Sequence, residues 1–185
     1  MIIPSPYYDG FDRSTLLSAQ KSENSTVFLF DVKALAQAHS KAIAEGKTVK
    51  AILIINPTNP FGVSYMKETL LSIFDYANRC DLWVLVDEIY GLSNYDQSNG
   101  QFNSVFSFRS RIPNAQKVIW LWSATKDLCL PAMRFALVHS EHRQLSAYLR
   151  QVASVLKPVS HPVQRLMRDL LSDYGMKPSV YRWTI

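Results

Sequence analysis

The chain has 185 residues, of which 48% are hydrophobic and 19% charged, and it carries a formal net charge of +5. This composition is typical of a globular protein and excludes collagen, coiled coils and intrinsically disordered chains. With roughly 100 to 200 residues per domain, the length predicts a single domain over residues 1–185.

The first 55 residues contain one predicted helix and one predicted strand. Residues 4–26 are rich in proline and turn-forming residues, and we expect them to be irregular. Asp31 can cap a helix over residues 32–45, in which apolar side chains recur at helical spacing. The apolar run at residues 50–55 is short and ends at Asn56-Pro57, which favours a buried strand.

The rest of the chain alternates between apolar strands and helices. In chain order we expect a helix over Met66–Arg79, a strand over Leu82–Val86, a polar loop over Ser93–Asn103, strands over Lys117–Trp122 and Arg134–His139, and helices over Glu141–Leu156 and Pro162–Tyr174. Such an alternation is typical of a mostly parallel sheet that helices cover on both faces. The predicted fold class is therefore α/β, with a mostly parallel sheet flanked by helices.

Several features bear on where the protein works. Apolar runs such as Ala51–Ile55 are much shorter than the roughly 20 residues of a membrane-spanning helix. The first six residues lack the positive leader of a secretory signal. Two cysteines are too few for a disulfide framework, and none has metal-binding spacing. We therefore expect a cytoplasmic, metal-free protein that contacts no membrane. A basic stripe on the predicted helix over residues 141–156 lacks the interleaved aromatic residues of a nucleic-acid surface, so no nucleic-acid partner is expected.

The residues that follow the strands are the first candidates for a site, because ligands of open α/β sheets bind beyond the carboxyl ends of the strands. The first strand leads into Asn56–Gly62, with the sequence NPTNPFG, and the second into Asp87–Tyr90, with the sequence DEIY. The third leads into Ser123–Asp127, and Arg134 follows Lys126 by eight residues. We expect these polar side chains to converge on one rim of the sheet.

These three motifs, in this order, resemble those of the class I and II aminotransferases, a family of pyridoxal-phosphate enzymes. The stretch Pro4–Arg13 is most similar to the branch that contains 1-aminocyclopropane-1-carboxylate synthase and its animal homologues. Because family members are about twice as long, the resemblance implies a partial large domain of the pyridoxal-phosphate-dependent transferase fold. A phosphate-binding loop would then lie before Met1, and the small domain after Ile185.

The resemblance assigns a role to each residue of the three motifs. Lys126 would be the Schiff-base lysine and, once freed, the general base for the substrate's α-proton. Asp87 would hold the ring nitrogen of the cofactor protonated, which makes the ring a better electron sink. Tyr90 and Asn59 would donate hydrogen bonds to the phenolic oxygen of the ring.

The remaining roles concern the phosphate and the ring face. Arg134 and Ser123 would bind the phosphate, since a guanidinium can pair with two oxygens at once. Tyr8 would stack on the ring, although Tyr7 could serve instead. The implied cofactor is pyridoxal 5'-phosphate, and Lys126 would act on an amino-acid substrate.

Two functional hypotheses remain open. The first is an aminotransferase or 1-aminocyclopropane-1-carboxylate synthase-like enzyme that works as a homodimer, with transamination and cyclising elimination both allowed. The second is a truncated, catalytically inactive relative that retains the fold and some cofactor affinity. Cys129, Ala132 and Ala136 favour the second, because they stand where the family usually has glycine and a side chain there is expected to exclude positive φ angles.

Overall fold

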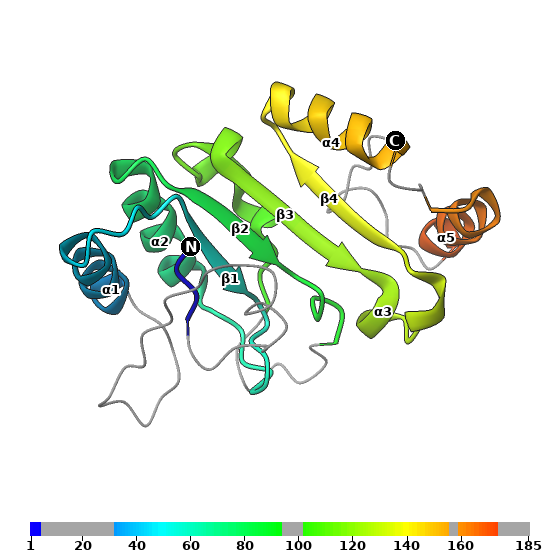
Figure 1. The fold of residues 1–185 in the computed structure, drawn as a ribbon. Helices are drawn as coiled ribbons and strands as arrows, with labels where there is room; N and C mark the ends of the chain where they lie inside the picture. The colour runs from blue at the N-terminus through cyan, green and yellow to red at the C-terminus, as the bar shows by residue number, and fades with distance from the viewer. Residues whose placement is uncertain (5–31, 94–101, 156–158, 174–185) are drawn as a thin grey trace.

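The computed structural model describes residues 1–4, 32–93, 102–155 and 159–173, and Figure 1 shows their arrangement. Tyr7, Tyr8 and nearly all of the stretch expected to be irregular, residues 4–26, lie outside the described residues. Among the described residues, no helix is long and apolar enough to cross a membrane.

Four strands form one sheet in the order β1-β2-β3-β4. They are β1 (Ala51–Ile55), β2 (Trp83–Asp87), β3 (Val118–Ser123) and β4 (Ala136–Ser140). β1 and β2 pair in parallel, as do β2 and β3, whereas β3 and β4 pair antiparallel. The outer side of β1 also forms a parallel bridge between Ile2 and Ile52. The predicted class, a mostly parallel α/β sheet, is confirmed.

The helices lie where the sequence predicts them, with ends that differ by one or two residues. They are α1 (Val32–Ala44), α2 (Lys67–Arg79), the single-turn α3 (Ala124–Asp127), α4 (Arg143–Val155) and α5 (His161–Asp173), with the 3₁₀ helices η3 (Val105–Arg111), η4 (Ala115–Lys117) and η5 (Pro131–Met133). The sequence did not predict α3 or the three 3₁₀ helices. Such short turns are too brief to produce a recognisable period of apolar residues.

The long helix α2 follows from its apolar spacing. Leu70, Ile73, Phe74 and Ala77 recur every three or four residues and are all buried. The backbone leaves the helical conformation just beyond its end, where Asp81 has a φ of 56°. α1 lies beside α2 near the β1 edge of the sheet (Figure 1), and the two helices are joined by a hydrogen bond of 2.9 Å between His39 Nδ1 and the Tyr76 hydroxyl.

The sheet has one buried face and one more open face. Ile54, Val86 and Trp120 are neighbours in the strand register and belong to the buried core, together with Phe74 of α2 and Phe108 of η3. We call the side of the sheet that carries these residues the buried face.

Side chains alternate between the two faces along each strand. Leu85, Asp87 and Leu121 therefore share the opposite side, which we call the open face, and all three are only partly buried. Val138 of β4 lies on this side as well and is 51% exposed. Leu53 and Ile55 of β1 also lie on this side and are buried. Within the described residues, the expected cover on the second face is therefore close at β1 and only partial at β2, β3 and β4.

Candidate active site

The three parallel strands end together at one edge of the sheet. Ile55 pairs with Asp87, and Asp87 pairs with Leu121. The ladder continues one step further, since Asn56 N donates to Asp87 O and Glu88 N donates to Leu121 O, each at 2.9 Å. The segments that follow β1, β2 and β3 therefore leave the sheet at the same edge, which we call the carboxyl edge.

A cavity of about 210 Å³ opens at the carboxyl edge. It is lined by Pro57, Thr58, Asn59, Pro60 and Gly62 from the turn after β1, and by Tyr90 and Ser93 from the loop after β2. Asn59 Nδ2 donates a hydrogen bond of 3.3 Å to the Tyr90 hydroxyl, so two of the predicted site residues meet in this cavity.

The turn that forms one wall of the cavity is held by its own backbone. Thr58 N donates to Val63 O at 2.9 Å, and Val63 N donates to Thr58 Oγ1 at 3.1 Å. Gly62 adopts a φ of 66°, a left-handed conformation that glycine takes without steric cost. These contacts present Asn59 toward the loop that carries Tyr90.

Asp87 ends β2 on the open face. Its Oδ1 accepts a hydrogen bond of 3.1 Å from Ile89 N. Burial raises the pKa of the Asp87 carboxyl to about 6, although this hydrogen bond opposes the shift. No cationic side chain among the described residues forms an ion pair with it. A partly desolvated carboxylate without a counterion is a place where a cationic group would be stabilised.

Glu88, the next residue, points the other way. Its carboxylate accepts three hydrogen bonds on the buried face, from Ser104 Oγ at 2.7 Å, Val105 N at 2.8 Å and Trp120 Nε1 at 2.7 Å. Burial raises the pKa of Glu88 to about 7; the three hydrogen bonds lower it, and the charge of Asp87 adds to the rise. The sequence analysis assigned no role to Glu88. The signal was present, because two successive residues at the end of a strand face opposite sides.

Lys126 lies on the single turn of α3, immediately after β3, and its side chain is exposed. Ser123 caps this turn, since its Oγ accepts a hydrogen bond of 3.2 Å from Thr125 N. The same hydroxyl donates to Phe135 O at 2.9 Å and lies 2.7 Å from Thr125 Oγ1. Because Phe135 follows Arg134 directly, Ser123 is tied to the segment that carries the predicted phosphate-binding arginine.

The segment from Lys126 to Arg134 contains two residues in the left-handed conformation. Cys129 has a φ of 52° and Arg134 a φ of 51°. The expectation that a side chain at Cys129 excludes a positive φ is therefore wrong. Cys129 is exposed, so its side chain meets no crowding from the core, and only the local cost of the left-handed conformation remains.

Asp127 is a second residue that the sequence analysis missed. Its carboxylate accepts hydrogen bonds from Trp122 Nε1 at 2.8 Å, Leu92 N at 3.0 Å and Ser93 Oγ at 2.7 Å. The loop after β2 is thus joined to the turn that carries Lys126. The motif Ser123–Asp127 was expected at this edge, but no local pattern indicated these bonds of Asp127, because its partners Leu92 and Ser93 are 35 and 34 residues away.

The predicted site residues fall into three groups in the structure. Asn59 and Tyr90 line the cavity and contact each other. Asp87, Ser123, Lys126 and Arg134 belong to segments at the same edge of the sheet but do not line the cavity. Tyr8 lies outside the described residues.

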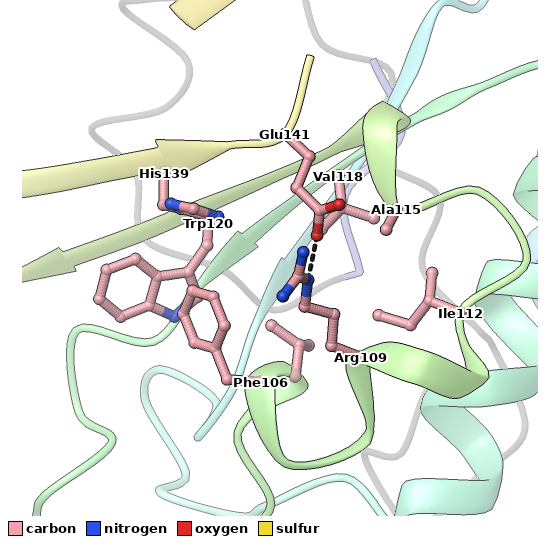
Figure 2. Close-up of a pocket in the computed structure, with 9 residues that line it drawn as sticks. Phe106, Arg109, Ile112, Ala115, Val118, Trp120, His139 and Glu141 are labelled. Carbon is pink, nitrogen blue, oxygen red and sulfur yellow. Dashed lines mark hydrogen bonds and ion pairs between the residues drawn. The ribbon is translucent and has the colours of Figure 1, made fainter. Parts of the chain in front are cut away.

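A second cavity lies between η3 and the strands β3 and β4 (Figure 2). Figure 2 shows Arg109 and Glu141, which form an ion pair at its rim, with Phe106, Trp120 and His139 beside them. Its volume is about 20 Å³, which is room for about one water molecule. This cavity is too small for pyridoxal phosphate, which leaves the carboxyl edge as the better place for a cofactor.

The side chains at the carboxyl edge suit pyridoxal phosphate chemically. Asp87 offers a partly desolvated carboxylate that has no ion-pair partner in the described part of the chain, and such a group would stabilise a protonated ring nitrogen. Asn59 and Tyr90 place hydrogen-bond donors in the larger cavity. Ser123 fits less directly, since its proton is donated to Phe135 O and would have to change partner to reach a phosphate oxygen.

Comparison with known proteins agrees with this fit. The model of the family "Aminotransferase class I and II" matches residues 1–182. A human protein named "probable inactive 1-aminocyclopropane-1-carboxylate synthase-like protein 2" is 30% identical over 192 residues, which covers 97% of this chain and 33% of that protein. The Arabidopsis thaliana 1-aminocyclopropane-1-carboxylate synthase 6 is 31% identical over 180 residues, covering 93% and 36% of the two chains. The chain thus spans about a third of the length of these relatives.

Solved structures show the same fold. Aspartate aminotransferase of Thermus thermophilus, as a double mutant, superposes with a TM-score of 0.74 at 19% identity, covering 97% of this chain and 45% of that chain. The pyridoxal-phosphate-bound C-S lyase of Staphylococcus hominis superposes with a TM-score of 0.69 at 19% identity, covering 95% and 43%. At such identities the likeness establishes the fold.

Proposed function

The chain belongs to the class I and II aminotransferase family, whose cofactor is pyridoxal phosphate, and we propose that it binds this cofactor at the carboxyl edge and acts on amino acids. The observation that carries the proposal is the partly desolvated carboxylate of Asp87, which forms no ion pair with any described residue and lies at the same edge as the Asn59 and Tyr90 donors. Partial burial of an unpaired charge costs free energy, and groups perturbed in this way cluster at functional sites, which supports a cationic ligand beside Asp87.

The proposal assigns distinct tasks to the residues at the edge. Pyridoxal phosphate, when bound, supplies an electron sink for negative charge at the substrate's α-carbon. Asp87 would keep the proton on the ring nitrogen. Tyr90 and Asn59 would donate hydrogen bonds to the phenolic oxygen. Tyr8, which lies outside the described residues, keeps the ring-stacking role that the family resemblance gives it.

Lys126 would hold the cofactor through its amine and, once free, would accept and return the proton of the substrate's α-carbon. Its exposed side chain would let the amine reach both the cofactor and the α-carbon. Arg134 would bind the phosphate with its guanidinium fork, and Ser123 would add a hydroxyl. Whether transamination or cyclising elimination follows depends on substrate contacts, and the homodimer typical of the family would supply part of them.

The test is cofactor attachment at Lys126. The 185-residue chain is incubated with pyridoxal phosphate, its visible absorption is recorded, and the bound cofactor is trapped with borohydride and located by peptide mass spectrometry. We expect the label on Lys126 and its loss in Lys126→Ala. Lys33→Ala is the matched control, because Lys33 is an exposed lysine at the start of α1, far along the chain from the carboxyl edge.

Two results would contradict the proposal. One is that the chain shows no visible absorption band with pyridoxal phosphate and that the trapped label is spread over its lysines at random. The other is a band that survives Lys126→Ala at full intensity. Either result would show that the carboxyl edge does not hold the cofactor through Lys126.

A catalytically inactive relative that retains the fold is the second candidate, and we infer it from the 30% identity to the human protein named probable inactive. The engaged Ser123 hydroxyl supports it too. This candidate predicts that labelled Lys126 persists after amino acids are added. Under the first proposal, amino acids displace Lys126 from the cofactor, so the absorption changes and the trapped label on Lys126 falls.

A further inference from the structure

We propose that Asp127 is a positioning residue, which holds the Lys126 turn against the loop that carries Tyr90. The inference rests on the proposed function, because its consequence is the attachment of pyridoxal phosphate to Lys126. It extends that function to a residue that neither lines the larger cavity nor was predicted from the sequence.

The carboxylate of Asp127 connects three separate parts of the carboxyl edge. One oxygen accepts hydrogen bonds from Trp122 Nε1 at 2.8 Å and from Leu92 N at 3.0 Å. The other accepts from Ser93 Oγ at 2.7 Å. Trp122 belongs to β3 and is 4% exposed, so it supplies a rigid anchor. Leu92 and Ser93 belong to the loop after β2.

The location of these bonds gives them a role in the site. Asp127 follows Lys126 directly, while Leu92 and Ser93 follow Tyr90 by two and three residues, and Ser93 lines the larger cavity. Lys126 is therefore connected to the cavity wall through the carboxylate of Asp127, the next residue, and through the short loop that carries Ser93. A hydrogen bond to a charged acceptor is stronger than a neutral one, so this link resists the separation of the two segments.

Two other side-chain contacts at the edge join different segments. Ser123 contacts Thr125 and Phe135, which lie on its own side of the edge. The Asn59 to Tyr90 bond joins the turn after β1 to the loop after β2 and does not reach α3. The two bonds from Leu92 N and Ser93 Oγ to Asp127 thus connect the lysine turn to the cavity loop, and the third bond ties the same carboxylate to β3.

The rate of a reaction falls steeply when a reacting group is misplaced. The Lys126 amine must therefore approach pyridoxal phosphate within a narrow range of distance and angle. Releasing the link lets the Lys126 turn and the cavity loop move independently. We therefore expect Asp127→Asn to slow the attachment of pyridoxal phosphate to Lys126 at least tenfold. The amide keeps one acceptor oxygen but turns an N–H toward a donor, so at least one of the three bonds is lost.

The experiment measures the rate of borohydride-trapped label on Lys126 in the parent chain and in Asp127→Asn, Ser93→Ala and Ser93→Thr. Asp75→Asn is the matched control, since Asp75 is an exposed aspartate on α2. Hydrogen exchange at the Leu92 amide is measured in the same samples without cofactor. A positioning role predicts slower labelling and faster Leu92 exchange in Asp127→Asn and Ser93→Ala, with recovery in Ser93→Thr, whose hydroxyl can still donate.

The outcomes separate the two proposals. A parent chain that leaves Lys126 unlabelled would overturn both. A labelled parent with Asp127→Asn and Ser93→Ala labelled at the parental rate would overturn the positioning role alone. So would variants that lose labelling only in proportion to their loss of folded protein, with Ser93→Thr as impaired as Ser93→Ala, because that pattern reports stability rather than position.

Discussion

The indole of Trp120 donates a hydrogen bond of 2.7 Å to the fully buried carboxylate of Glu88. Ser104 Oγ and Val105 N donate to the same carboxylate, so Glu88 joins β2, β3 and the N-terminal end of η3. Its neighbour Asp87 faces the other side of the sheet. Two successive residues thus have different roles: Glu88 holds segments together on the buried face, and Asp87 is a candidate cofactor ligand on the open face.

The first prediction concerns the pH dependence of stability. The pKa of Glu88 is raised from 4.5 to about 7, so folding favours its protonated form. The stability that this preference adds is complete below about pH 4.5 and is lost as the pH rises to about 7. Asp87, with a pKa raised from 3.8 to about 6, acts in the same direction.

We expect the free energy of unfolding of the cofactor-free chain to fall between pH 5 and pH 8 by on the order of 2 kcal/mol from Glu88, at about 1.4 kcal/mol per pKa unit. Glu88→Gln should flatten this part of the profile. Urea unfolding at both pH values measures it, with Glu68→Gln, an exposed glutamate on α2, as the control. A Glu88→Gln profile parallel to that of the parent would contradict the assignment.

The second prediction is that Asp87→Asn changes stability and cofactor affinity in opposite directions. The substitution removes a partly desolvated charge that has no ion-pair partner among residues 1–4, 32–93, 102–155 and 159–173, so at pH 8 the cofactor-free chain should become more stable by about 1 kcal/mol. The affinity for pyridoxal phosphate should fall at least tenfold, because the ring nitrogen loses its partner. Thermal unfolding and absorbance titration measure the two effects. Loss of stability together with unchanged affinity would show that Asp87 serves the fold instead.

The third prediction concerns the hydrogen bond between Asn59 and Tyr90. Tyr90→Phe removes the hydroxyl from the larger cavity, and a hydrogen bond contributes about 1 kcal/mol. We expect the dissociation constant for pyridoxal phosphate to rise about fivefold. Tyr148→Phe is the matched control, since Tyr148 is 62% exposed on α4. Equal affinities for the two variants would exclude Tyr90 from the cofactor site.

The fourth prediction concerns the backbone beside Lys126. Cys129 is exposed and has a φ of 52°, so Cys129→Gly should stabilise the chain or leave it unchanged, within about 1 kcal/mol. Cys129→Val should destabilise it, because a β-branched side chain resists positive φ. Ala132→Gly is the comparison, since Ala132 has no positive φ. Glycine at this position only increases the conformational entropy of the unfolded chain, so it should lower the free energy of unfolding. Denaturant unfolding ranks the three variants.

The sequence by itself determined the strands, the helices α1, α2, α4 and α5, and their order. Helical spacing located α2 and short apolar runs located the strands, each to within two residues, because both patterns are local properties of the chain. It also determined that the polar motifs beginning at Asn56, Asp87 and Ser123 follow strands, and therefore that they meet at one edge of a parallel sheet.

Only the tertiary structure decided which side of the sheet each side chain of these motifs faces and which residues it contacts. The faces taken by Asp87 and Glu88 depend on which side η3 covers, and η3 leaves no periodic signal in the sequence. The bonds from Leu92 and Ser93 to Asp127 depend on how two loops more than thirty residues apart pack together. Contacts of this kind are set by strand register and packing between distant segments, so no local pattern of residues could have predicted them.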